Sequence, residues 1–124
     1  MTGVIPGVPG LDLHLPLLLD LVARGSLTWS SLIRTTATTP ARLFGLRRKG
    51  AITVGNDADL VFVDPNREWT VRAADLPGSA GWSPYEGRSL RGSVVETWSR
   101  GVPVARDGQP IGRPGHGRFI ARAA

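Results

Sequence analysis

The side chains that could do chemistry in this chain of 124 residues are few and scattered. Its two histidines, His14 and His116, lie near opposite ends of the sequence. Because a metal site needs three or four convergent donors, we interpret His14 as a polar residue at a helix start and His116 as a solvated residue of a glycine-rich tail. The chain has no cysteine, which excludes disulfides, thiolate zinc sites and a cysteine nucleophile.

The carboxylates offer one suggestive spacing. Asp57 and Asp59 form an Asp-x-Asp pair whose side chains share a face of an extended chain. A metal or an acid–base couple would suit this pair, but we prefer turn capping before a buried strand, because aspartate caps turns readily. Three further aspartates have no basic partner or cluster that the sequence reveals: Asp12, Asp20 and Asp107.

The elements that would position these residues begin with helices. Leu15, Leu18, Leu19 and Val22 recur at helical spacing and predict a helix over Leu11–Arg24, which ends at Gly25. Two shorter helices should follow, one capped by Thr28 and one that begins at Thr39-Pro40 and stops at Gly45. The first ten residues contain five proline or glycine breakers and read as a loop.

Beyond Gly50 the pattern changes to short strands. The predicted strands are Ala51–Val54, Leu60–Val63, Glu68–Arg72, Ser93–Arg100 and Val102–Arg106. The apolar run Leu60–Val63 predicts a strand buried on both faces, and Asp107-Gly108 predicts a turn. Ala73–Gly87 reads as a long irregular stretch, and the tail from Gly112 is expected to need a partner surface for order. The sequence therefore predicts an α+β chain with two units, residues 1–48 and 49–124.

Composition narrows the classes of function. The net charge is +5 and the pI about 11.2, but the arginines are dispersed and only Arg47-Arg48-Lys49 form a run. A nucleic-acid binder would more often cluster its basic residues, so no nucleic-acid partner is expected. Leu11–Ala23 is too short and too polar to span a membrane, and nothing at the N-terminus resembles a signal peptide. A cytoplasmic protein without a membrane partner is the expectation.

Six stretches, in order, carry a resemblance to a known family. They are GVPGLDLHLPLLLDLVARG (7–25), TTATTPARLFGL (35–46), KGAITVGNDADLVFVDP (49–65), EWTV (68–71), WSPYEGRSLRGSVVETWSRGVPV (82–104) and PGHGRF (114–119). Together they resemble the C-terminal part of cyclic amidohydrolases, with dihydroorotase and allantoinase as the nearest branches and dihydropyrimidinase and hydantoinase next. Each motif alone is weak, but six in the right order are specific.

The resemblance implies a fold and a reaction. It implies the C-terminal part of a metal-dependent (β/α)8 TIM barrel, with residues 1–48 as the loop after strand eight and the closing helices. Residues 49–124 would form the C-terminal part of the small β-sandwich beside it. The family hydrolyses a C–N bond of a cyclic amide, as in pyrimidine metabolism, with a pair of metal ions, usually zinc.

The same resemblance implies that the zinc ligands and the catalytic aspartate lie upstream of Met1. No catalytic or metal-binding residue is therefore assigned in this chain. We expect it to be inactive alone, as a truncated or split gene product.

One site element falls within the chain by this resemblance. Pro6 and Gly7 match a pair that contacts the substrate ring in dihydroorotases, largely through backbone groups. A glycine lets the backbone approach closely, and a backbone N–H and C=O match the polar edge of a cyclic amide. A tight turn with no role in binding is the equal alternative.

Two partners follow from these expectations. As an enzyme segment, the chain would bind the missing upstream barrel segment or assemble as a family homo-oligomer. A small cyclic amide would bind only to the complete enzyme. The alternative is a non-catalytic scaffold or interaction module derived from the family, because an uncovered leucine stripe would seek a partner.

Overall fold

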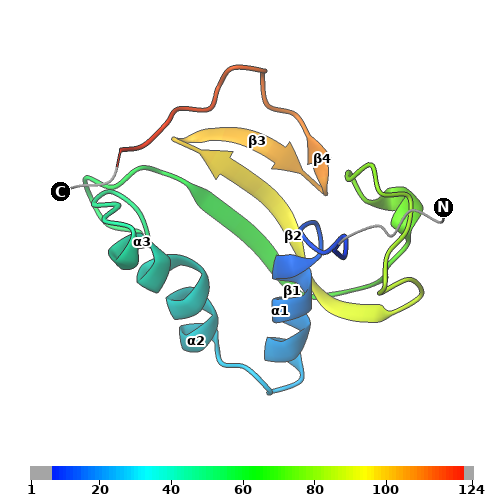
Figure 1. The fold of residues 1–124 in the computed structure, drawn as a ribbon. Helices are drawn as coiled ribbons and strands as arrows, with labels where there is room; N and C mark the ends of the chain where they lie inside the picture. Colours follow the sequence, from blue (N-terminus) through cyan, green and yellow to red (C-terminus); the bar gives the residue numbers. More distant parts are fainter. Residues whose placement is uncertain (1–6, 122–124) are drawn as a thin grey trace.

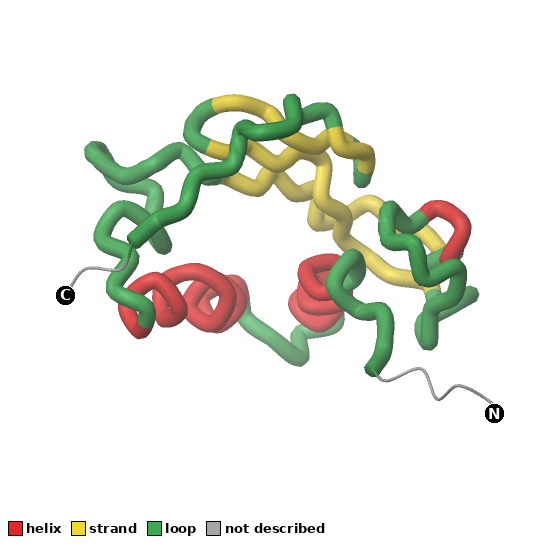
Figure 2. Tube along the Cα trace, turned by 45° about the horizontal axis from the view of Figure 1, so that its top comes forward, coloured by secondary structure: helices red, strands yellow, loops and turns green. Residues whose placement is uncertain are grey.

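The computed structural model describes residues 7–121, which form an α+β arrangement (Figure 1). The helical elements come first: α1 (His14–Ala23), α2 (Trp29–Ile33), a π-helical turn (Arg34–Thr38) and α3 (Thr39–Leu43). The strands follow: β1 (Leu60–Thr70), β2 (Ser89–Ser99), β3 (Val102–Arg106) and β4 (Gln109–Pro110). They make one antiparallel sheet in the order β1-β2-β3-β4, with the helices on one side (Figure 2). The predicted α+β class is confirmed.

The sheet is built around a long, irregular pairing of β1 with β2. The register is broken between Phe62 and Val63 and again between Asp64 and Glu68. At the second break the Asp64 carboxylate accepts hydrogen bonds from the backbone N–H groups of Asn66 and Arg67, at 2.9 and 3.2 Å. This local turn accommodates a proline at position 65, which has no N–H for the ladder. The predicted strand Leu60–Val63 and the first three residues of the predicted strand Glu68–Arg72 thus belong to one bulged strand, which ends at Thr70.

The hairpins at the other edge follow their sequence signals closely. Strand β3 covers Val102–Arg106, the range predicted from the sequence. The turn before it has Arg100 and Gly101 in the left-handed region, with φ of 49° and 78°. The Asp107-Gly108 turn also has two positive φ values, 46° and 77°, as a tight hairpin requires.

Helix α1 ends at a glycine, as expected. Gly25 has φ 74°, and its N–H donates to the Val22 carbonyl at 3.0 Å, while the N–H of Ser26 reaches the Leu21 carbonyl at 2.9 Å. This pair of bonds satisfies carbonyls that the helix leaves free and turns the chain toward α2. The Thr28 hydroxyl then accepts a bond from the Ser31 N–H at 3.1 Å and caps α2, which confirms that prediction.

The predicted break before Pro40 is wrong. Thr39 has helical backbone angles and does not cap a new helix, so residues 29–43 form one continuous helical stretch. An interior proline normally clashes with the carbonyl four residues before it. Here a π-helical turn precedes the proline, and the Thr39 N–H bonds to the Arg34 carbonyl, five residues back. The wider turn removes the steric conflict and keeps the helix intact.

The core lies where α1 packs against the end of the sheet. Its centre is Leu13, Val71 and Leu90, each at most 2% exposed. Helix α1 approaches β2 closely at Gly92, where an added Cβ would lie 2.7 Å from the Cβ of Leu19. Gly92 also has φ +100°, so both space and backbone conformation call for glycine at this crossing.

The buried side of α1 differs from the predicted leucine stripe. Of the four residues that define that stripe, only Leu19 is buried. The fully buried side instead includes Leu13, Pro16 and Asp20. An apolar pattern could not locate this side, because an aspartate is buried only when its charge is compensated.

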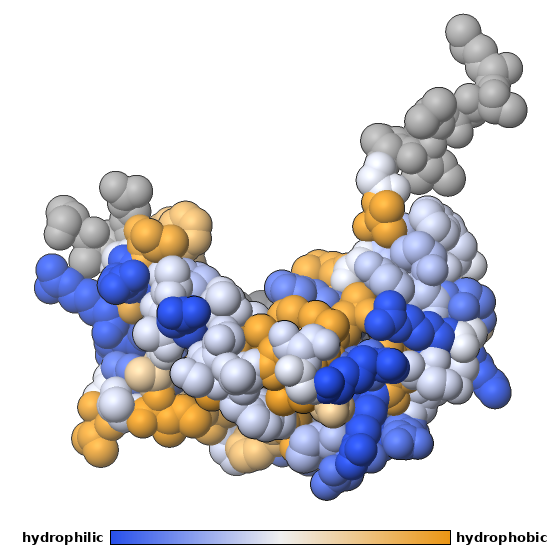
Figure 3. All heavy atoms as spheres, turned by 90° about the horizontal axis from the view of Figure 1, so that it is seen from below, coloured by the Kyte–Doolittle hydropathy of each residue, from blue (hydrophilic) through white to orange (hydrophobic). Residues whose placement is uncertain are grey.

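Much apolar surface is uncovered in this chain. Val61 and Phe62 of β1 are 49% and 44% exposed, so the expectation of burial on both faces is wrong for the chain by itself. The predicted strand Ala51–Val54 is also wrong: the segment is irregular and its Ile52 and Val54 side chains are exposed. Figure 3 shows apolar residues gathered in several places on the face seen from the helix side.

The tail beyond β4 lies against its own chain. The N–H of Gly112 donates to the Val104 carbonyl at 3.0 Å, and an added Cβ at Gly112 would meet the Val104 side chain at 3.2 Å. Further along, the Arg100 guanidinium donates to the His116 carbonyl. The β2–β3 hairpin thus orders the tail, so the expectation that order requires a partner is wrong for the described part.

Candidate functional site

The predicted substrate pair lies at the edge of what the structure describes. Pro6 is outside residues 7–121, and Gly7 is an exposed residue in the segment that leads into α1. Gly7 has φ +90°, and nothing lies within 4 Å of a Cβ built on it. Its backbone is therefore accessible and adopts a conformation that L side chains rarely take. This geometry suits either of the two roles that the sequence left open.

The segment between Gly7 and α1 is attached to the rest of the fold at its far end. The Leu13 side chain is buried in the core, and the Leu13 N–H donates to the Gly10 carbonyl at 3.2 Å. Beside it, the Asp12 carboxylate accepts a hydrogen bond from the Gly78 N–H at 3.2 Å. Asp12 therefore has a partner 66 positions away that the sequence did not reveal.

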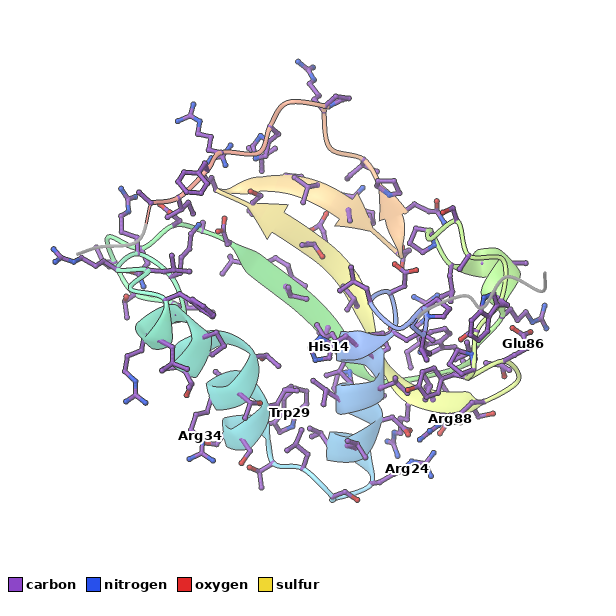
Figure 4. All side chains as sticks on the ribbon, viewed as in Figure 1. His14, Arg24, Trp29, Arg34, Glu86 and Arg88 are labelled. Carbon is purple, nitrogen blue, oxygen red and sulfur yellow. The ribbon has the colours of Figure 1, made fainter. Side chains whose placement is uncertain are left out.

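The residues described do not fit a binuclear zinc centre. Within residues 7–121 there is no group of three or more His, Cys, Asp or Glu side chains placed to hold a metal ion. His14 is exposed at the first position of α1 (Figure 4). His116 is half-buried, with its Nε2 3.0 Å from the Ser99 carbonyl, so its interpretation as a solvated residue is wrong.

The carboxylate with the densest set of partners is Asp20, which sequence reasoning left without a role. It is 1% exposed and accepts hydrogen bonds from the Arg24 side chain at 2.7 Å, the Arg91 backbone N–H at 3.1 Å and the Arg88 side chain at 3.4 Å. The Arg24 hydrogen bond lowers the pKa of Asp20, burial opposes it, and the bond from Arg91 adds to the lowering. Figure 4 shows Arg24 and Arg88 beside the lower part of α1.

This cluster joins helix to sheet rather than forming an open site. Arg24 lies one helical turn beyond Asp20, a spacing that the sequence could have shown as an i,i+4 pair. Arg88 and Arg91 belong to the other side of the contact, and only the packing of α1 on β2 brings them near. Both carboxylate oxygens of Asp20 accept hydrogen bonds from groups of this chain, so its role is structural.

The Asp57 and Asp59 pair forms a second ionic cluster. Both carboxylates bond the ammonium of Lys49, whose side chain is 14% exposed, and Asp57 also pairs with Arg48 at 2.7 Å. Asp59 accepts the backbone N–H of Arg100 at 2.7 Å, which caps the β2–β3 turn rather than its own. The two carboxylates point to the same side of the chain, as expected, and the Lys49 ammonium lies between them.

The charges in this second cluster stabilise one another. Burial tends to lower the pKa of Lys49, but its hydrogen bonds to Asp59 and Asp57 outweigh burial and raise it. Burial likewise tends to raise the pKa of Asp59, but the Lys49 bond and the Arg100 N–H bring it below its usual value. A lysine held in its charged form is a poor nucleophile or base, so this cluster does not supply one.

A model of the amidohydrolase family matches residues 10–104. The chain belongs to the amidohydrolase family. Within the family, this amidohydrolase chain is similar to proteins of the dihydroorotase and hydantoinase kinds, as the sequence resemblance implied.

Three relatives illustrate the likeness. The dihydroorotase of Pyrococcus furiosus is 40% identical over 116 residues, covering 94% of this chain and 28% of the relative. A solved structure of L-hydantoinase (dihydropyrimidinase) from Arthrobacter aurescens has a TM-score of 0.89 and 35% identity, covering 94% and 26%. The inactive dihydroorotase-like domain of the Chaetomium thermophilum CAD-like multifunctional protein has a TM-score of 0.59 and 25% identity, covering 81% and 26%.

The chain thus spans about a quarter of the length of the relatives it matches. The structural likeness to the solved L-hydantoinase extends over nearly all of this chain, and the chain itself is a small α+β unit with one antiparallel sheet in residues 7–121. Among residues 7–121, none of the helices has the length and apolar character to cross a lipid bilayer.

Proposed function

We propose that this chain supplies the C-terminal part of a cyclic amidohydrolase that hydrolyses a C–N bond in a cyclic amide such as dihydroorotate or a hydantoin. The observation that carries the proposal is the continuous likeness to such enzymes over 94% of the chain, at 40% identity and at a TM-score of 0.89. Residues 7–43 then correspond to the closing helices of the barrel, and the sheet to part of the β-sandwich beside it.

We also propose that the chain is inactive alone. Hydrolysis in this family requires a metal pair, and the side chains of residues 7–121 do not converge into a group that could hold one. The zinc ions and their ligands would then belong to the remaining part of the enzyme. This chain would contribute the backbone of Gly7, whose accessible N–H and C=O can pair with the polar edge of a cyclic amide.

The partner in this proposal is the upstream barrel segment of an amidohydrolase. The chain exposes large apolar side chains on several elements: Trp29, Ile33, Leu43, Phe44, Val61 and Phe62. Exposed apolar surface of this kind favours association, because its burial removes it from water. A complete enzyme would cover these side chains and give the small core of this chain additional support.

The test is reconstitution. The chain would be produced with the part of the Pyrococcus furiosus dihydroorotase that precedes the matching segment, and turnover of dihydroorotate and of hydantoin would be measured with added zinc. Turnover by the assembled pair, with none by either part, supports the proposal. Zinc-dependent turnover by the isolated chain would refute its inactivity, and two folded parts that fail to bind would refute the partner.

A non-catalytic assembly module is the second candidate. It is favoured by the likeness to the inactive dihydroorotase-like domain, which shares the fold at a TM-score of 0.59. The same reconstitution separates the two candidates. A stable complex without turnover of either substrate, next to an active intact Pyrococcus enzyme, favours the module. Turnover by the complex favours the enzyme segment.

A further inference from the structure

Residues 72–86 form a long excursion between β1 and β2. Its base is closed by two backbone hydrogen bonds, from the Val71 N–H to the Arg88 carbonyl and from the Gly87 N–H to the Val71 carbonyl, both 2.9 Å. Inside it, the only regular element is the short 3-10 turn Ala73–Asp75. Irregular connections of this length in a compact unit usually have a function of their own. None of the roles described above uses it.

The excursion is held in a defined conformation. The Glu86 carboxylate accepts the Ala73 N–H at 2.6 Å and so joins its two ends. Leu76 packs against the core around Leu13. A segment with an ordered backbone and a partly buried side chain such as Leu76 can hold a neighbouring segment in place, whereas a loose loop could not.

The excursion meets the segment that carries Gly7. The Gly78 N–H donates to the Asp12 carboxylate, and a Cβ on Gly78 would lie only 2.5 Å from the accepting oxygen. The carboxylate therefore lies directly against the Gly78 backbone. Asp12 is five positions after Gly7 and lies within the turn that the Leu13 N–H closes on the Gly10 carbonyl.

We infer that the excursion is a brace for residues 7–10, the described part of the proposed substrate loop, and that Asp12 and Gly78 are its positioning residues. Together, the packing of Leu76 against the core around Leu13 and the Asp12–Gly78 hydrogen bond hold the base of residues 7–10. The brace sets where the Gly7 backbone lies relative to a bound cyclic amide. This inference rests on the proposed function, since it concerns the substrate loop of that function.

The first test uses the isolated chain and hydrogen exchange. Asp12→Ala should increase the exchange of the hydrogen-bonded backbone amides of Leu13, His14 and Gly78 by about five-fold, because a net hydrogen bond is lost. Asp12→Asn keeps an accepting oxygen and should restore most of the protection. Asp75→Ala removes an exposed carboxylate from the same excursion and is the matched control. Equal exchange of the Leu13, His14 and Gly78 amides in the two alanine variants overturns the brace.

The second test uses the reconstituted enzyme. Asp12→Ala should raise KM for the cyclic amide about five- to ten-fold with kcat changed less than about two-fold, because substrate binding rather than chemistry is affected. Gly78→Ala, which displaces the carboxylate, should act in the same direction, and Asp75→Ala should not. If the wild-type assembly lacks turnover, the proposed function fails, whereas the exchange experiment still decides the brace. Unchanged KM in both positioning variants, with an active wild type, also overturns the inference.

Discussion

Replacing Asp20 by asparagine should destabilise the fold, because this carboxylate joins α1 to the sheet. Asparagine has the same shape and can still accept the Arg91 N–H through its carbonyl oxygen. Its amide group, however, would face the guanidinium groups of Arg24 and Arg88, which are donors only. The substitution thus removes the charge and two hydrogen bonds without creating a cavity.

The magnitude follows from burial. Breaking a fully buried ion pair costs about 3–5 kcal/mol. The side chains of Arg24 and Arg88 are 58% and 45% exposed and can regain water, which reduces the cost. A value of about 2 kcal/mol is expected for Asp20→Asn and about 2–3 kcal/mol for Asp20→Ala, which also loses the bond to Arg91.

Urea unfolding followed by tryptophan fluorescence measures this cost. The free energy of unfolding of Asp20→Asn should fall by about 2 kcal/mol. The slope of this free energy against urea concentration should stay constant, since the surface exposed on unfolding is similar. Asp75→Ala, which removes an exposed carboxylate, should stay within about 0.5 kcal/mol of the wild type. If Asp20→Asn costs no more than this control, the structural role of the carboxylate is refuted.

The pH dependence gives an independent check. The folded pKa of Asp20 lies below its ordinary value of 3.8. The stability contributed by its charge is therefore fully present above that value and is lost as pH falls through the lower folded pKa. The difference in unfolding free energy between wild type and Asp20→Asn should be constant from pH 7 to about 5 and shrink below pH 4. A difference that grows on acidification would contradict the assignment.

Two further substitutions test other contacts. Gly92→Ala should cost about 2–4 kcal/mol, because its positive φ is strained in alanine and the new Cβ would meet Leu19. Gly87→Ala, with a similar positive φ but open space beside it, should cost only about 1 kcal/mol. Thermal unfolding of both variants then separates the cost of the contact with Leu19 from the cost of the positive φ. Lys49→Met should cost about 1–2 kcal/mol, because it leaves Asp59 and its neighbouring carboxylate without their common cation. Added salt should reduce the difference in unfolding free energy between Lys49→Met and wild type. A difference that salt does not change would argue against an ionic origin.

Elements with strong local signals were predictable from the sequence. Val102–Arg106 is a strand at the predicted residues, and the turn signals at Asp107-Gly108 and Gly25 adopt the expected backbone. These features depend on the conformational preferences of a few adjacent residues. The order of six motifs likewise indicated the amidohydrolase family, because the information lies in residue identities and not in their packing. A short apolar run such as Ala51–Val54 carries no comparable signal, and it is not a strand.

Three features required knowledge of contacts between distant residues. The burial of Asp20 depends on Arg88 and Arg91, which are 68 and 71 positions away. The partner of Asp12 is a backbone group 66 positions away, in an excursion with no regular pattern. The exposure of Phe62 depends on which other parts of the protein cover β1. The apolar run around Phe62 indicates burial but does not indicate which residues provide it.

The amino-acid sequence alone thus determined the family, the α+β class and the turns, because these depend on residue type and local backbone preference. The tertiary structure decided which side of α1 is buried, where each isolated carboxylate finds its donors and how the substrate-loop segment is held. Those outcomes depend on distances between residues far apart in the chain, and folding sets such distances through packing that no local pattern encodes.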